Sequence, residues 1–219
     1  MSQVQGGVAI AETLFGMNNP GGKLPVTFYN SHYIETVDFL NMSMVNRTYR
    51  YYNGPDVIYP FGFGLSYSDF QIEWNSSSST HDVVVETNKE TDPIVLDVNV
   101  RNVRGPRGDE VVQVYLEPTS PFRHNTLIER RRLIEFQRIS VASNSSSSVS
   151  FSISPSVFKI VDENGMRSLY NNSEFTILVT RGNGNDILKR QVRVVKPPAD
   201  SLNNDDDNRN DEKMFEKWW

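Results

Sequence analysis

Regular alternation of apolar and polar residues begins at residue 94 and recurs as far as residue 195. Apolar residues occupy every second position in two segments, 94–100 and 112–116, which a turn at 104–108 separates. Because side chains alternate across an extended strand, each segment is expected to bury one face. Further short strands are expected at residues 133–141, 149–153, 175–179 and 192–195. Short strands without intervening helices predict an antiparallel β-sandwich.

The first 66 residues follow a different pattern. Residues 7–15 place apolar side chains at helical spacing on two adjacent faces, and Gly16 suits a helix C-terminus. Residues 24–28 alternate as a short strand, in which Pro25 favours an edge position. Residues 30–58 show little periodicity and are expected to form an irregular crossing loop. One helix and one strand cannot enclose a core, so they either pack on the β domain or belong to a sheet outside this sequence.

An aromatic stretch at residues 47–67 links the two patterns. In its second half, large side chains at 59, 61, 63, 65 and 67 alternate with proline, glycine and serine. An extended chain would place the aromatic residues on one face, which is expected to be core. The opposite glycine face suits close approach of another backbone or of a ligand. The first half, 47–52, alternates arginine and tyrosine more densely than a surface loop requires.

Composition narrows the possible chemistry. The 219 residues carry a net charge of −5, and no basic face is apparent, which argues against a nucleic-acid partner. The arginine run at 130–132 is expected to be a solvated strand end. There is no cysteine, and the three histidines lack metal-ligand spacing, so neither disulfides, a metal site nor a cofactor is expected. No apolar run is long enough for a transmembrane helix, so no membrane partner is expected.

Three sequence blocks resemble glycoside hydrolase family 3. GVAIAETLFG at 7–16 is similar to a helix of that family, and NPGGKLPVT at 19–27 to its usual continuation. RTYRYY followed by YPFGFGLSY resembles the junction between its α/β sandwich domain and its fibronectin type III-like domain. The preceding NMSM is most similar to the β-xylosidase branch.

The C-terminal half shares this resemblance. GDEVVQVYL at 108–116 is similar to the family's fibronectin type III-like domain, as are Leu133, Phe136 and Arg138 in one strand. Glu135 stands where the family usually has glycine, which bears on a local bulge. The turn at 104–107 is also longer and more basic than the common form.

The resemblance implies a mainly β chain with three parts. Residues 1–66 correspond to the end of the α/β sandwich domain, a short α/β remnant, and residues 67–196 to a fibronectin type III-like antiparallel β-sandwich of the immunoglobulin-like kind. Composition, rather than the resemblance, sets apart residues 197–219 as an acidic tail that is expected to be disordered. The expected partners are the barrel and α/β sandwich domains of the parent enzyme, through which a saccharide substrate is bound.

Secretion of the parent enzyme is expected mainly from the resemblance. The N-terminus has neither the basic start nor the apolar centre of a signal peptide. Five N-x-S/T acceptors give weak further support, since a Ser- and Asn-rich sequence also produces them by chance. The candidate glycosylation sites are Asn41, Asn46, Asn75, Asn144 and Asn171.

Retaining glycoside hydrolysis requires two carboxyl groups about 5–5.5 Å apart. The resemblance implies an aspartate nucleophile on the barrel and a glutamate acid/base in the α/β sandwich, both upstream of Met1. Acidic residues within the chain do not supply a convincing substitute pair, and Asp109 and Glu110 are expected to be solvated at a turn. No catalytic residue is therefore expected here. The acids considered are Glu12, Asp38, Asp56, Asp109 and Glu110.

Arg47, Tyr49, Arg50 and Tyr51 are the candidate site residues. Their guanidinium groups can hydrogen-bond sugar hydroxyls and their rings can stack on a sugar face, which would place them at the rim of a substrate cleft. Alternatively, Arg47 and Arg50 bridge the two domains through buried ion pairs. A glycan at Asn46 would crowd a cleft next to Tyr49.

Two functions from different classes compete. In the first, the chain is the C-terminal part of a glycosidase that hydrolyses terminal β-linked xylose, arabinose or glucose, and it supplies structure but no catalytic carboxylates. In the second, it is a stand-alone β-sandwich that binds carbohydrate or protein, or a purely structural module. Whether an in-frame barrel is encoded upstream separates these readings.

Overall fold

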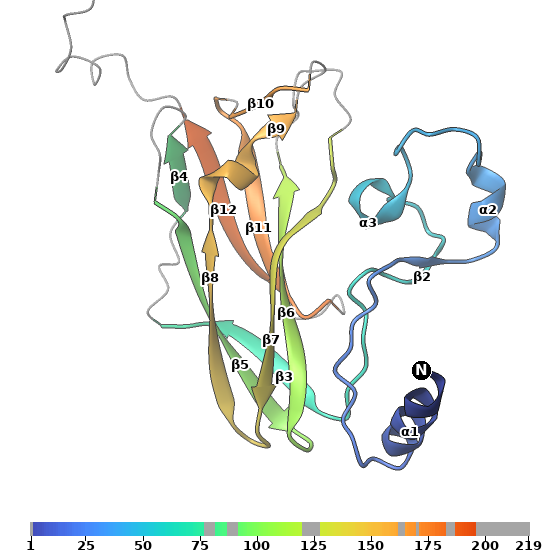
Figure 1. The fold of residues 1–219 in the computed structure, drawn as a ribbon. Helices are drawn as coiled ribbons and strands as arrows, with labels where there is room; N and C mark the ends of the chain where they lie inside the picture. The colour runs from blue at the N-terminus through green and yellow to red at the C-terminus, as the bar shows by residue number, and fades with distance from the viewer. Residues whose placement is uncertain are drawn as a thin grey trace, which may run out of the picture.

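The computed structural model describes residues 2–76, 82–86, 92–119, 128–161, 165–169, 171–182 and 187–195. They form a two-layer β-sandwich with an arm along one side (Figure 1). We use "the arm" for residues 2–66 and "the sandwich" for residues 67–195. The expected acidic tail, residues 197–219, and most of the polar segment 75–80 lie outside the described residues.

The sandwich consists of a five-stranded and a three-stranded sheet. The larger has the order β4 (Val83–Glu86), β12 (Leu188–Val195), β11 (Glu174–Thr180), β6 (Gly108–Pro118) and β7 (Arg132–Val141). The smaller has the order β3 (Asp69–Trp74), β5 (Ile94–Arg104) and β8 (Ser146–Ile153). All these pairs are antiparallel except β4 with β12, which is parallel.

The predicted sandwich is confirmed. The alternation predicted for residues 94–100 and 112–116 is found in β5 and β6, each of which turns one face toward the core, and the turn between them carries the chain from the smaller sheet to the larger. The remaining predicted strands correspond to β7, β8, β11 and β12. The sequence reading missed β3 and β4, although Phe70 and Ile72 alternate with polar residues in β3 and are buried.

The core lies between the two sheets and extends to a short 3-10 helix, η1 (Pro155–Phe158). Leu96 and Val98 of β5 face Val112 of β6 and Ile177 of β11 in one continuous cluster. Burial of each such aliphatic side chain stabilises the fold by about 1.5–3 kcal/mol. A two-stranded ribbon, β9 (Ile160–Val161) with β10 (Arg167–Ser168), follows η1.

β7 contains a bulge at Ile134. Val114 pairs with Glu135, whereas Tyr115 pairs with Leu133, so one residue of β7 has no opposite partner. The bulge directly precedes Glu135, the position at which the resemblance expects glycine. The strand continues to Val141, so glutamate is compatible with the bulge.

The arm holds short elements: α1 (Ser2–Leu14), β1 (Phe28–Tyr29), α2 (His32–Thr36), α3 (Thr48–Tyr51) and β2 (Val57–Tyr59). Helix α1 begins five residues earlier than predicted. Its C-terminus is a Schellman motif: Gly16 has φ +71°, Met17 N donates to Glu12 O at 2.8 Å, and Gly16 N donates to Thr13 O at 3.1 Å. The prediction for Gly16 is therefore confirmed.

Two predictions for the arm are wrong. Residues 24–28 do not form a strand, because the chain bends at Pro25 and only Phe28–Tyr29 pairs with β2. Residues 30–58 are not wholly irregular, since they contain α2, α3 and β2. Helices of four or five residues are too short to produce a periodic pattern.

The aromatic stretch does not continue as a strand beyond Tyr59. The chain turns at Phe61 and Gly62, where φ of Gly62 is +81°, so the expected alternation of faces is lost. Leu65 and Tyr67 are exposed, which contradicts the expectation that the aromatic face is core. The expectation for the glycines is confirmed: Gly64 is buried, and a Cβ there would overlap the carbonyl oxygen of Gly22.

Candidate functional site

The arm lies against the sandwich on the side of β6 and β7, while α1 projects away from it (Figure 1). Contacts at three levels join the two parts: an asparagine clamp near α1, a buried charge cluster, and an aromatic and arginine cluster near α3. We refer to these contacts together as the junction.

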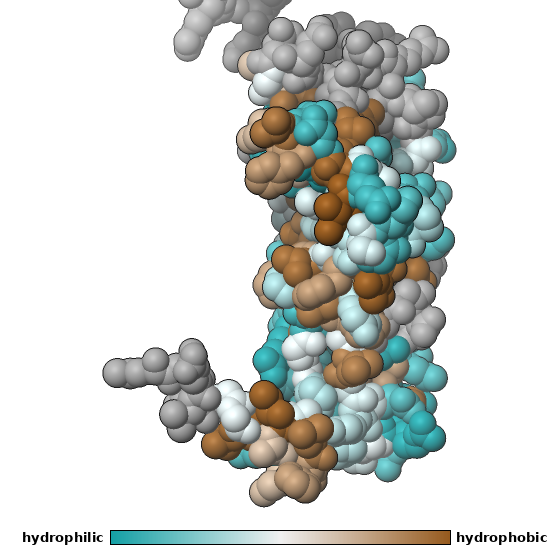
Figure 2. All heavy atoms as spheres, turned by 90° about the vertical axis from the view of Figure 1, so that its right-hand side faces the viewer, coloured by the Kyte–Doolittle hydropathy of each residue, from teal (hydrophilic) through white to brown (hydrophobic). Residues whose placement is uncertain are grey.

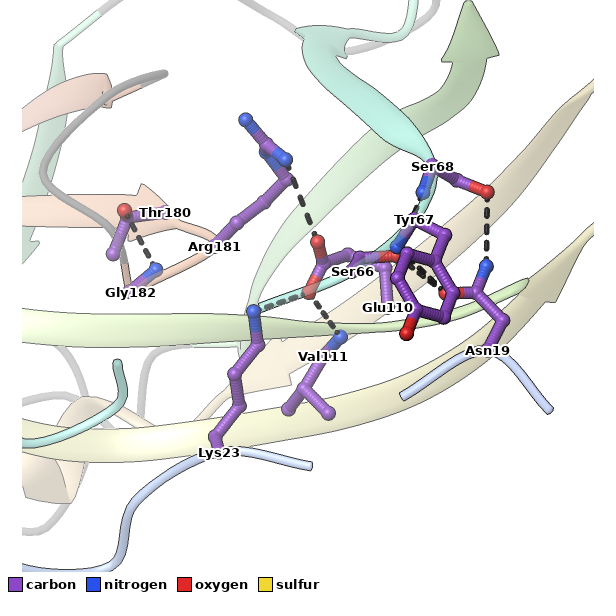
Figure 3. Close-up of polar contacts among 10 residues, drawn as sticks. All are labelled: Asn19, Lys23, Ser66, Tyr67, Ser68, Glu110, Val111, Thr180, Arg181 and Gly182. Atoms are coloured by element: carbon purple, nitrogen blue, oxygen red, sulfur yellow. Dashed lines mark hydrogen bonds and ion pairs between the residues drawn. The ribbon is translucent and has the colours of Figure 1, made fainter. Parts of the chain in front are cut away.

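Asn19 forms the clamp. Its Nδ2 donates to Ser68 Oγ at 2.9 Å, and its Oδ1 accepts from Tyr67 N at 2.8 Å and from Ser66 Oγ at 3.0 Å (Figure 3). Tyr67 in turn donates its hydroxyl to Thr13 O at 2.6 Å. The amide thus ties the block at 19–27 to the end of the aromatic stretch, so two sequence blocks meet in space.

A buried carboxylate lies next to this clamp. Glu110, 2% exposed, accepts from Lys23 Nζ at 2.7 Å and from its neighbour Val111 N at 2.8 Å, and Arg181 Nη1 lies 3.4 Å away (Figure 3). Lys23 comes from the arm, whereas Arg181 follows β11. The expectation that Glu110 is solvated at a turn is wrong, because an ionised carboxylate can be buried only when it is paired.

The sequence did contain a signal for Glu110. It lies in the same parity along β6 as Val112 and Val114, so the alternation places a charge on a buried face. Asp109, on the opposite parity, is partly exposed and lies 2.7 Å from Arg138 Nη2. Hydrogen bonding by the Ser140 side chain, and then by Arg138, lowers the pKa of Asp109.

Arg50 and Tyr51 connect α3 to the segment before β7. Arg50 forms an ion pair with Glu129, and its carbonyl accepts from Arg130 N at 2.7 Å. Tyr51 OH lies 3.5 Å from the same carboxylate, and Arg132 Nε is also 3.5 Å from it. Burial, and then the charge of Glu129, raise the pKa of Tyr51, so its hydroxyl stays protonated.

Tyr49 anchors the arm to the outer face of the larger sheet. Its ring stacks on Phe61 at 4.1 Å between centroids and meets Tyr115 edge-on at 6.0 Å. Its hydroxyl accepts from Leu133 N at 3.2 Å. Tyr115 is buried, which raises the pKa of its hydroxyl, and that hydroxyl donates to Gln113 Oε1 at 2.8 Å.

Arg47 forms its side-chain hydrogen bonds within the arm. Its Nη2 donates to Asp38 O at 2.7 Å and to Asn41 O at 2.6 Å, so it closes its own loop. The structure therefore brings Tyr49, Arg50 and Tyr51 together at the junction and leaves Arg47 in the arm. The arginine run at 130–132 is not simply solvated, because Arg131 pairs with Glu117 at 2.5 Å and Arg132 reaches Glu129.

A second buried carboxylate holds the arm itself together. Asp56 accepts from Tyr52 OH at 2.6 Å and lies 3.1 Å from His32 Nδ1. These hydrogen bonds, that of Tyr52 first, lower the pKa of Asp56. Burial raises the pKa of Tyr52. Asp56 and Glu110 are thus both engaged in structural contacts rather than arranged as a catalytic pair.

The candidate glycosylation sites are accessible. Asn41, Asn46, Asn144 and Asn171 are exposed and Asn75 is partly exposed. Asn46 has φ +56° and lies three residues before Tyr49. Among the described residues, no group of three acidic or histidine side chains could hold a metal ion. No described helix has the length and apolar character needed to span a membrane.

The fold is that of a fibronectin type III-like sandwich, and comparison with known families agrees. Residues 110–182 match the Fibronectin type III-like domain, and residues 2–67 match the Glycosyl hydrolase family 3 C-terminal domain. The chain therefore belongs to glycoside hydrolase family 3 and corresponds to a C-terminal segment of its enzymes.

Relatives support this assignment. Beta-D-xylosidase 1 of Arabidopsis thaliana is 34% identical over 75% of this chain and 25% of its own length. Xylan 1,4-beta-xylosidase of Xylanibacter ruminicola is 35% identical over 58% of this chain and 14% of its own length. This chain therefore spans about a quarter or less of these relatives.

Solved structures share the fold. A GH3 exo-beta-xylosidase in complex with a xylobiose aziridine probe superposes with a TM-score of 0.71 at 20% identity, over 86% of this chain and 26% of that one. A beta-glucosidase from Listeria innocua in complex with glucose gives a TM-score of 0.65 at 20% identity, over the same shares.

Proposed function

We propose that this chain is the non-catalytic C-terminal part of a β-xylosidase that removes terminal β-linked xylose. The observation that carries the proposal is the similarity of 75% of this chain to Beta-D-xylosidase 1 of Arabidopsis thaliana, of which it covers a quarter. The buried acids support it further, because Asp56 and Glu110 are occupied by Tyr52 and Lys23. The chain's own role is then structural: the sandwich holds the arm in place against the catalytic domains.

The surface of the arm indicates where those domains bind. Figure 2 shows this side of the molecule, on which apolar side chains gather from the level of α1 to that of α2 and α3. Exposed apolar side chains gathered on one side of a protein are typical of an interaction surface. The preceding α/β domain of the parent enzyme is the occupant that we propose. The exposed apolar side chains of the arm include Val8, Ile10, Leu14, Phe15, Met17, Ile34, Phe39, Leu40 and Met42.

A chimera tests the proposal. This chain replaces the segment that it matches in Beta-D-xylosidase 1 of Arabidopsis thaliana, and hydrolysis of an aryl β-xyloside is compared with that by the relative lacking the segment. We expect the chimera to hydrolyse the xyloside, whereas the truncated relative and this chain alone do not. Turnover by this chain alone, abolished by Asp56→Asn or Glu12→Gln, would contradict the proposal, as would full activity of the truncated relative. Aryl arabinosides and glucosides in the same assay identify the preferred sugar.

We further propose that the parent enzyme is a secreted glycoprotein. The exposed acceptors at Asn41, Asn46 and Asn144 support this. Expression in a glycosylating host should give a mass above that of the polypeptide, reduced stepwise by Asn→Gln at each occupied position. An unmodified mass from the secretory pathway of that host would contradict it.

A further inference from the structure

A small open cavity lies at the junction, between the arm and the outer face of the larger sheet. Its volume is about 100 Å³, enough for several water molecules. Aromatic rings from both parts of the chain form half of its wall. They are Tyr29, Tyr49, Tyr52 and Phe61 of the arm and Tyr115 of β6.

The hydroxyl groups of two residues of the wall are buried and do not face the cavity. Thr27 Oγ1 and Tyr29 OH have almost no exposed surface. Burial raises the pKa of Tyr29, and a side-chain interaction with Thr27 opposes this shift. The surface that a ligand can reach is therefore mainly aromatic, which suits the C–H face of a sugar ring.

Charge at the cavity is positive. Arg130 and Arg131 line it, and Arg131 is paired with Glu117 and lies 5.4 Å from the centroid of the Tyr115 ring. Within the part of the chain that the structure describes, Arg130 forms no ion pair, and its Nη1 donates only to Tyr52 O at 3.3 Å. No acidic residue lines the cavity. An uncompensated guanidinium group favours a carboxylate, which it binds through two parallel hydrogen bonds.

We infer that this cavity binds one pyranose ring that carries a carboxylate, a uronic acid unit, at a site that performs no chemistry. The ring lies against the aromatic wall, and its carboxylate meets Arg130. The inference deepens the proposed function, because it adds a sugar subsite to the junction of the same enzyme.

Ligand-observed NMR titration of the full chain tests the inference. Methyl β-D-glucuronide is compared with methyl β-D-glucoside, which has the same ring without the carboxylate. We expect the glucuronide to bind with a Kd on the order of 1 mM and about tenfold more tightly than the glucoside, since a hydrogen bond to a charged group contributes about that much. Absence of glucuronide binding at millimolar ligand, or equal binding of the two glycosides, would overturn the inference.

Two arginine variants locate the site. Arg130→Gln should weaken glucuronide binding about tenfold and leave glucoside binding unchanged. Arg193→Gln is the matched control, because Arg193 is an exposed arginine of β12 that pairs with Glu174. Equal losses in both variants would show a non-specific charge effect and overturn the inference. Competition by acetate as effective as that by glucuronide would do the same, because it would show an anion site without sugar recognition.

Binding and turnover report on different claims. Glucuronide binding by this chain without activity of the chimera would remove the proposed function and leave the subsite intact. Activity of the chimera without glucuronide binding would remove the subsite alone.

Discussion

Large apolar side chains are mostly buried in the sandwich, whereas many of those in the arm are exposed. Phe158 of the sandwich is fully buried, 5.3 Å from Phe175 between ring centroids, whereas Phe39 of the arm is 90% exposed. The sandwich closes its core with its own strands, while the arm contributes apolar side chains to a surface that no described part of this chain covers. The comparison shows that two regions of the same chain need not form a single folding unit.

Substitution of equivalent residues in the two regions should give the largest difference. Phe158→Ala creates a cavity in the sandwich and is expected to lower the free energy of unfolding by about 3–5 kcal/mol. Phe39→Ala removes an exposed ring and should change it by less than about 0.5 kcal/mol. Urea denaturation followed by circular dichroism measures both. Equal effects would contradict the contrast between the regions.

The contact that joins the regions should give the next largest effect. Glu110→Gln keeps the shape of the side chain but removes the charge that Lys23 and Arg181 share. We expect the free energy that holds the arm on the sandwich to fall by about 2–3 kcal/mol. Protease cleavage within the arm should accelerate while the sandwich stays intact.

Glu135→Gln is the control for that substitution. Glu135 is exposed, and its carboxylate accepts a hydrogen bond from the adjacent Phe136 N at 3.1 Å. This variant should leave the cleavage rate unchanged. Faster cleavage in both variants would mean that overall charge, rather than the buried cluster, holds the arm.

The end of α1 should respond more weakly. Gly16→Ala places a side chain at φ +71° and is expected to destabilise the helix end by about 1 kcal/mol. Gly22→Ala is a useful comparison, since Gly22 has space for a methyl group. Hydrogen exchange of the α1 amides, measured in the chimera with Beta-D-xylosidase 1, should quicken only in the first variant, and an equal change in both would contradict the cap.

Lowering the pH should loosen the arm before it unfolds the sandwich. This effect is the smallest one expected, because it is absent at neutral pH. The pKa of Asp56 is lowered in the folded chain, so its contribution is fully present above the ordinary aspartate pKa of about 4 and is lost as pH falls through the lower folded value. Protease sensitivity of the arm should therefore rise below about pH 4, and Asp56→Asn should remove this dependence. An unchanged acid profile in the variant would contradict the assignment.

The sandwich was predictable because its strands carry an alternating pattern that burial enforces. Residues 94–100 and 112–116 alternate because one face of β5 and of β6 is core. β4 escaped prediction because a four-residue edge strand in parallel pairing has too little pattern to read.

The arm was less predictable because its partners are distant in sequence. Lys23 and Glu110 are 87 positions apart, and no local pattern pairs them, although the parity of Glu110 in β6 marked it as buried. Likewise Arg50 and Glu129 meet only after the chain folds. The family resemblance supplied the domain order, whereas periodicity alone misread residues 24–28 and 59–67.

Hydrogen exchange of α1 shows whether the arm depends on a preceding domain for its stability. The amides of residues 7–14 are followed in this chain alone and in the chimera with Beta-D-xylosidase 1, with those of β5 and β11 as internal references. We expect fast exchange of α1 in the isolated chain, slow exchange in the chimera, and slow exchange of both strands in each. Equally slow exchange of α1 in the isolated chain would show instead that the arm is stable without a preceding domain.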